Sequence, residues 1–343
     1  MTETVFHKPG PEHDPNKVRR SKDGRPYVWV DCQECDNGKV PSAKTGRPVQ
    51  CPKCKGAGRK ETLFSRCTSF VGVLEERSQL ERWKQRTILI GFNREPDLLF
   101  DIGSVDPDDR DALHALIDKA FEVGDGHVRA QKGTDLHSLS VYVDNGWRLP
   151  EMLWNEDGDD RPVTLQDRAD MAAWKRTVTD MNLTMLAQEL FVVNDEYRIG
   201  GTYDRRVTWP ATPCPCGKPT ILDLKTGRID YGQGKIAQQL AVYAHSRDYD
   251  PATGTRTAQD VCEHVGLVIH LPQGTGKATV HTADLVLGWE AVALSAAVRV
   301  HRREQADMLT QVEGGDSLFF STVTPETQQA AVPAPQPAVS ESF

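Results

Sequence analysis

The segment GGTYDRRVTWPATPCPCGKPTILDLK, residues 200–225, predicts two β-strands joined by a ten-residue connection. Alternating and β-branched residues place the strands at about 198–209 and 220–225, and Pro and Gly interrupt the residues between them. In the second strand Leu222 and Leu224 share one face, which we expect to lie against a core. The segment therefore predicts a strand pair with one buried and one polar face.

The polar face of this strand pair carries the side chains that could bind a metal ion or take part in catalysis. Asp223 and Lys225 share it, and if Trp209 pairs with Thr220, Asp204 lies opposite Lys225 and diagonal to Asp223. Two carboxylates this close repel each other unless a cation lies between them. Mg²⁺ or Mn²⁺ suits oxygen ligands and keeps positions for water and phosphate, so the pattern indicates phosphodiester hydrolysis. The alternative is a surface hairpin whose Asp and Lys side chains face water.

The rest of the chain alternates between helical and strand periods. We therefore expect an α/β fold with a mixed central sheet flanked by helices. Helices are expected at 68–91, 111–123, 128–143, 165–181, 236–246 and 283–308, and further strands at 189–193, 265–271 and 278–282.

Four motifs in this order resemble a known family. Asp204 followed by Asp223-Leu224-Lys225 resembles the D…(D/E)xK signature of the PD-(D/E)XK (restriction-endonuclease-like) nucleases. GTDLH, residues 133–137, resembles the GTxxH motif of the RecB-like branch, which includes CRISPR-associated and phage exonucleases. QLAVY, residues 239–243, resembles its QxxxY motif, and Glu189 matches the position of a further acidic residue. The similarity spans roughly residues 64–308.

The resemblance implies a role for each of these residues. Metal ligands would be His137, Asp204, Asp223 and the Leu224 carbonyl, and Lys225 would orient or activate the attacking water. The further catalytic residues would be Glu189, Gln239 and Tyr243. The i, i+4 spacing puts Gln239 and Tyr243 on one helix face, where they could also be a packing pair, and His137 could be a surface histidine. Whether the site would hold one metal ion or two is left open by the sequence.

Two CxxC pairs near the N-terminus predict a zinc site. The first pair is Cys32 and Cys35, and the second is Cys51 and Cys54. Fifteen residues lie between the two pairs, a spacing suited to tetrahedral Zn²⁺. The second pair, in CPKCKGAG, resembles the CxxCxGxG repeat of DnaJ-type zinc domains. The segment is poor in apolar residues, so four unligated thiols would leave it little to fold around.

The remaining cysteines do not predict a second metal site. Cys214 and Cys216 could supply two ligands, but we interpret them as incidental residues of a turn. Some CRISPR-associated RecB-like exonucleases hold an iron-sulfur cluster with one early and three late cysteines. Cys67 stands in the early place, but only Cys262 follows Asp223, so we expect no cluster.

Composition and charge suggest four regions. We expect a flexible basic arm at 1–26, the zinc module at 27–60, the nuclease domain at 61–312 and a disordered Pro- and Gln-rich tail at 313–343. The net charge is −8, yet residues 1–60 hold 13 Lys or Arg against 7 Asp or Glu. This excess favours contact with a polyanion, although a solvated basic tail would look the same.

These features together predict a metal-dependent DNA exonuclease. DNA with free ends or a single-stranded portion is the expected partner, and recombination or replication proteins are possible further partners. The rival predictions are a structure-specific endonuclease with the same site and a non-catalytic, zinc-dependent nucleic-acid-binding accessory protein. With neither a signal sequence nor a long apolar segment, the chain is expected in the cytoplasm and not in a membrane.

Overall fold

A computed structural model describes residues 18–154, 160–305 and 308 of the chain. The described residues up to Arg299 belong to one compact unit, and the described residues from Val300 onward belong to a second. The expected tail at 313–343 and residues 1–17 of the expected arm lie outside the described residues. None of the described helices is both long and apolar enough to cross a membrane.

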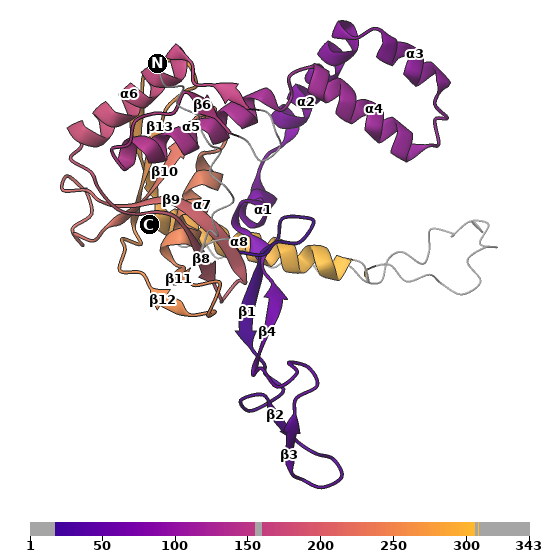
Figure 1. The fold of residues 1–343 in the computed structure, drawn as a ribbon, viewed down its shortest axis with the longest axis vertical. Helices are drawn as coiled ribbons and strands as arrows, with labels where there is room; N and C mark the ends of the chain where they lie inside the picture. Colours follow the sequence, from indigo (N-terminus) through magenta and orange to yellow (C-terminus); the bar gives the residue numbers. More distant parts are fainter. Residues whose placement is uncertain (1–17, 155–159, 306–307, 309–343) are drawn as a thin grey trace, which may run out of the picture. The chain divides into compact units, whose positions relative to one another are not determined.

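A mixed central sheet organises the first unit (Figure 1). Its order is β12 (Arg256–Ala258), β11 (Arg247–Tyr249), β8 (Thr184–Asn194), β9 (Ile199–Thr208), β10 (Thr220–Lys225), β13 (Val265–His270) and β14 (Thr279–Asp284). Strands β10 and β13 are parallel, and the short β5 (Ser65–Arg66) pairs in parallel with β9. The other neighbours are antiparallel. The expectation of a mixed sheet flanked by helices is therefore confirmed.

Helices cover both faces of this sheet. On one face α1 (Cys67–Val71), α7 (Gln233–Ala244) and α8 (Leu285–Glu304) bury residues such as Leu240 against Ile221. On the other face α5 (Val128–Asp144) and α6 (Leu165–Asp180) pack onto Leu222 and Leu224, as the alternation predicts. Strand β10 is buried on both faces because it is a central strand covered on each side, so Asp223, on the face opposite Leu222 and Leu224, is buried as well.

The segment before α5 departs from the expected single helix at 68–91. It forms α1, a 3₁₀ turn at Gly72–Leu74 and α2 (Ser78–Arg94), because the backbone is extended at Glu75. The expected loop at 95–111 contains a further helix, α3 (Asp97–Ser104), which precedes α4 (Arg110–Val123). Helices α2 and α4 pack closely, since an added Cβ on Gly91 would lie 1.8 Å from the Ala120 carbonyl oxygen.

The N-terminal cysteines lie in a module built from two small hairpins. Strands β1 (Tyr27–Asp31) and β4 (Arg59–Leu63) pair with each other, and the chain between them forms β2 (Lys39–Pro41) and β3 (Pro48–Gln50). The boundary expected between residues 60 and 61 falls inside β4. Val28 and Phe64 pack with Phe191 of β8 and Tyr249 of β11, so this hairpin shares a core with the central sheet.

Candidate active site and metal centres

The site forms where β9 and β10 separate. The ladder between them runs from Thr220↔Val207 to Leu222↔Arg205, which places Asp204 level with Asp223. The expected pairing of Trp209 with Thr220 is therefore wrong by two residues, because β9 ends at Thr208 and Trp209 begins a turn. Beyond the last pair the Leu224 N–H donates to Asp204 Oδ2 at 2.7 Å instead of to a strand carbonyl. Asp204 is thus fixed at the point of separation.

Strand β9 reverses its faces at this same residue. Tyr203 packs against Tyr243 of α7, whereas Arg205 pairs with Asp144 of α5 on the opposite face of the sheet. Across the ladder Glu189 lies between the pairs Gln188↔Arg205 and Leu190↔Tyr203, hence opposite Asp204. Glu189 has a φ of +49°, a left-handed conformation that costs a non-glycine residue about 1 kcal/mol or more. Such strain persists where the surroundings impose it, and functional sites are common among these places.

His137 reaches the site from α5. Its Nδ1 lies 3.3 Å from Asp204 Oδ2, and its side chain is partly exposed. One turn earlier, an added Cβ on Gly133 would lie 3.0 Å from Thr226 Oγ1, so the glycine lets α5 approach the residues after β10. The atoms closest to such a Cβ belong to the side chains of Thr226 and Gln273.

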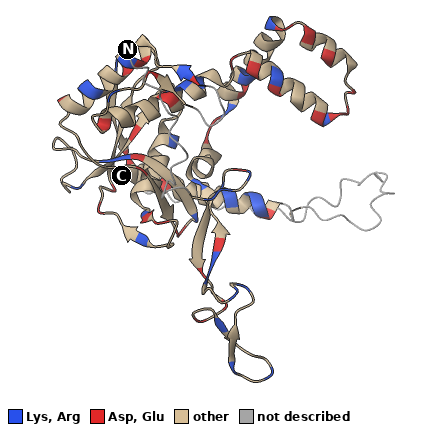
Figure 2. Ribbon diagram, in the orientation of Figure 1, with Lys and Arg blue, Asp and Glu red and all other residues tan. Residues whose placement is uncertain are grey.

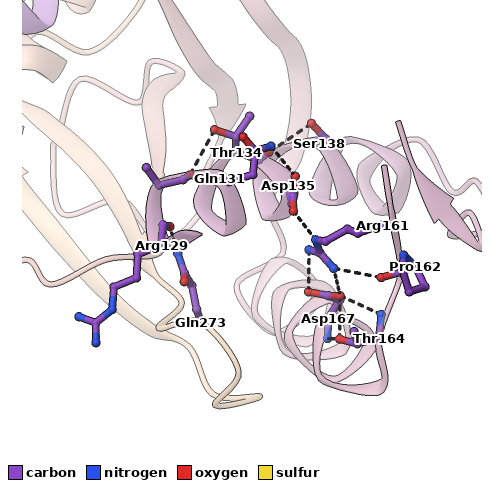
Figure 3. Close-up of polar contacts among 11 residues, drawn as sticks. Arg129, Gln131, Thr134, Asp135, Ser138, Arg161, Pro162, Thr164, Asp167 and Gln273 are labelled. Atoms are coloured by element: carbon purple, nitrogen blue, oxygen red, sulfur yellow. Dashed lines mark hydrogen bonds and ion pairs between the residues drawn. The ribbon is translucent and has the colours of Figure 1, made fainter. Parts of the chain in front are cut away.

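A buried polar network fixes α5 in this position (Figure 3). Asp135 is 1% exposed. It accepts a hydrogen bond from Gln131 Nε2 at 3.1 Å and forms an ion pair with Arg161. Arg161 also contacts Asp167 at 2.7 Å, and Asp167 forms the capping box of α6 with Thr164. Because each charge has a partner, this network can hold α5, which carries His137, in a defined position against the start of α6.

A second set of contacts links β10 to α7. Lys225 Nζ lies 2.6 Å from Asp223 Oδ2 and donates to Gln239 Oε1 at 3.5 Å. Gln239 Nε2 in turn donates to the Tyr243 hydroxyl at 3.1 Å. The i, i+4 pair therefore faces the sheet and positions the ammonium. Nearby, the buried Cys67 thiol lies 4.0 Å from the Gln239 carbonyl oxygen.

The electrostatics of the site reflect crowded carboxylates. Burial raises the pKa of Asp223, and the Asp204 charge adds to this, while the Lys225 ammonium opposes it. Burial alone would lower the pKa of Lys225, but Asp223 and Asp204 outweigh it and the pKa is raised. Desolvation by surrounding protein, together with Asp204 and Asp223, raises the pKa of Glu189 to about 7 although solvent still reaches its side chain.

Not every expected ligand occupies the same cluster. Ligand atoms of His137, Glu189 and Asp204 lie within 4.8 Å of one another, so Glu189 joins the candidate ligands. Asp223 is instead paired with Lys225 beside this group, and Leu224 contributes its N–H to Asp204. An imidazole with two carboxylates can hold a divalent cation. Without a cation between them, the two negative charges are unfavourably close.

The four N-terminal cysteines converge as their spacing predicts. The Sγ atoms of Cys32 and Cys51 lie 3.9 Å apart, and those of Cys35 and Cys54 lie 3.6 Å apart. Tetrahedral Zn²⁺ with Zn–S bonds of about 2.3 Å requires Sγ separations of about 3.8 Å. The backbone permits this convergence because Gly38 touches Gly56, where an added Cβ would lie 2.1 Å from the carbonyl oxygen. The group is therefore compatible with zinc.

A second group of thiols lies at the far end of β10. Ligand atoms of Cys214, Cys216, Cys262 and His264 lie within 4.8 Å of one another. The interpretation of Cys214 and Cys216 as incidental turn residues overlooked the later CEH segment, which supplies two more candidate ligands. Among the described residues, Cys67 belongs to neither cysteine group.

Comparisons with known proteins add little to this geometry. No model of a protein family matches the chain, and no curated protein matches it in sequence. The crystal structure of SSO0001 is similar to part of it, with 15% identity and a TM-score of 0.20. That match covers 38% of this chain and 59% of SSO0001, and at this TM-score it carries no argument.

Proposed function

We propose that the protein is a Mg²⁺- or Mn²⁺-dependent deoxyribonuclease with a PD-(D/E)XK core that digests DNA from free ends or single-stranded portions. The observation that carries the proposal is the group His137, Glu189 and Asp204 within 4.8 Å, beside the Asp223–Lys225 pair. Carboxylates and an imidazole around a possible cation, with an ammonium next to them, suit the hydrolysis of a phosphodiester.

Each side chain has a chemical task in this proposal. His137, Glu189 and Asp204, with Asp223 beside them, would hold one or two divalent ions, which polarise the phosphate and activate water. Lys225 keeps its proton, since its pKa is raised, and its ammonium donates hydrogen bonds to the attacking water or to a phosphate oxygen. Gln239 and Tyr243 limit the positions that this ammonium can take.

The distribution of charge supports contact of DNA with the N-terminal module. Figure 2 shows acidic residues on α3 and α4, where Asp97, Asp101, Asp111 and Asp118 lie. A phosphate backbone is repelled by such a surface. The chain between β1 and β4 carries instead five Lys or Arg against two Asp or Glu, and we propose that it binds Zn²⁺ through its four cysteines and contacts DNA.

The test is cleavage of linear double-stranded, single-stranded and covalently closed circular DNA with Mg²⁺, Mn²⁺ or no added divalent ion. Chelators are avoided because they would also remove zinc. Asp204→Asn and Asp223→Asn should each lower the cleavage rate by roughly a hundredfold or more, since each removes a charge from the ion site. Asp195→Asn, which changes an exposed carboxylate in the turn after β8 that is paired with Arg256 of β12, is the control and should cleave as wild type does.

The outcomes separate the rival functions. Release of nucleotides from linear DNA while the closed circle stays intact supports the exonuclease, and nicking of the circle supports the structure-specific endonuclease. Tight DNA binding without cleavage of any substrate, under either metal, would mean a non-catalytic accessory protein and would refute the proposed activity.

A further inference from the structure

Two loops that are distant in sequence bring four metal-binding side chains together. Cys214 and Cys216 lie in the connection between β9 and β10, and Cys262 and His264 lie just before β13. Cys214 Sγ is 3.2 Å from Cys216 Sγ and 3.8 Å from His264 Nδ1. We propose that these four residues bind a second structural Zn²⁺ ion, separate from the Cys32–Cys54 group and independent of the proposed nuclease activity.

The geometry is close to what tetrahedral Zn²⁺ requires. With bonds of about 2.3 Å to sulfur and about 2.0 Å to nitrogen, ligand atoms lie about 3.5 to 3.8 Å apart. The distance from Cys214 Sγ to His264 Nδ1 is about 0.3 Å longer than the sulfur–nitrogen value, and the two thiols need to separate by about half an ångström. Their separation of 3.2 Å is well beyond the roughly 2.05 Å of a disulfide bond.

The backbone around the group donates a hydrogen bond to one of the sulfurs and holds the two loops together. The Val265 N–H donates to Cys262 Sγ at 3.3 Å, which favours a charged sulfur. The Cys262 N–H donates to the Pro219 carbonyl at 2.7 Å, which joins the two loops directly. Gly217 has a φ of +64°, so the chain can turn back immediately after Cys216.

The donor set selects the kind of ion and its role. Three thiols and one imidazole favour Zn²⁺ over Mg²⁺ or Mn²⁺, which prefer oxygen. Four protein ligands leave no position for water or substrate, which is typical of a structural site. Cys214 and Cys262 are buried, so the ion would fasten the proline-rich connection to β13 at the end of β10 remote from Lys225.

Elemental analysis of natively purified protein tests this proposal. Wild type should hold two Zn²⁺ per chain, Cys262→Ser one, Cys51→Ser one, and the double variant none. Cys67→Ser, a buried cysteine outside both groups, is the matched control and should keep two. Cobalt replacement in Cys51→Ser should give the visible absorption of tetrahedral Co²⁺ with three sulfur ligands and one nitrogen ligand.

Other results would overturn the second site. Zinc that is unchanged in Cys262→Ser, or iron in place of zinc after anaerobic purification, would refute it. So would six instead of eight titratable thiols in the denatured wild type with Cys214 disulfide-bonded to Cys216. If Cys262→Ser does not fold, His264→Gln replaces an exposed ligand, and it should retain one Zn²⁺ firmly and lose the other to a mild chelator. Retention of both ions equally in that variant would also contradict the proposal.

Discussion

Replacing Glu189 by Gln tests whether the carboxylates of the candidate ion site are held together at a cost in stability. Without a bound cation, desolvation by the surrounding protein, followed by the charges of Asp204 and Asp223, raises the pKa of Glu189 from 4.5 to about 7. In a buried group this rise would correspond to about 3.4 kcal/mol. Because solvent reaches the Glu189 side chain, we expect the substitution to stabilise the metal-free protein by about 1 kcal/mol.

The size of the effect depends on pH, and its sign depends on whether Mg²⁺ is bound. Below pH 4.5 the Glu189 carboxyl is protonated in both the folded and the unfolded chain, so the variant and wild type are equally stable. As the pH rises from 4.5 to about 7, the unfolded chain ionises first and wild type loses stability. The gain of Glu189→Gln is therefore complete above pH 7 and shrinks as the pH falls. With saturating Mg²⁺ the order reverses, because the amide is a poorer ligand than the carboxylate.

Urea unfolding followed by tryptophan fluorescence measures this difference at pH 8 and pH 5.5, without chelator and with or without Mg²⁺. Glu196→Gln, an exposed carboxylate in the turn between β8 and β9, serves as the matched control. The reasoning is refuted if Glu189→Gln is no more stable than wild type at pH 8 without Mg²⁺. It is equally refuted if the gain is as large at pH 5.5.

Three further predictions address the ammonium, the buried ion pair and the cysteine module. Lys225→Ala should lose cleavage but bind Mg²⁺ in calorimetry, since an ammonium is no ligand; lost binding would contradict this. Asp144→Ala should lower the free energy of unfolding by about 3 to 5 kcal/mol, because Arg205, 0% exposed, is left as a buried unpaired charge. The double variant Asp144→Leu/Arg205→Met should recover most of that loss, and failure to do so would show that the pair is not the cause. Replacing residues 32–58 with Asn-Gly, which closes the hairpin at Asp31↔Arg59, should lower the salt dependence of DNA binding by about 0.7 to 0.9 in slope per lost phosphate contact. Single-turnover cleavage at saturating DNA should stay within roughly tenfold, and an unchanged slope would exclude the module from the DNA interface.

Strands and helices with a regular period were predictable from the sequence. The alternation in 220–225 indicates which residues of β10 face the core, and the i, i+4 spacing indicates that Gln239 and Tyr243 share a helix face. The convergence of the N-terminal cysteines follows from their local spacing. In each case the information lies within a few residues of the feature.

Irregular and long-range features were not predictable in the same way. The pairing of β9 with β10 depends on where the turn at Trp209 begins, and the face reversal at Asp204 breaks the alternation on which strand predictions rely. The left-handed backbone of Glu189 has no signal in its residue type, because it is imposed by neighbouring strands. Cys262 and His264 complete the second cysteine group only because β13 pairs with β10.

The parallel pairing of β10 with β13 also has a consequence for how the chain folds. Leu222 pairs with Leu267 across a connection that contains α7, and the candidate ion site further requires His137 from α5 and Glu189 from β8. Contacts between residues so distant along the chain form slowly, since the entropy of closing long loops is lost before the contacts are gained. Newly synthesised or partly unfolded chains would therefore lack the assembled carboxylates, and binding of a divalent ion at this site would report that folding is complete.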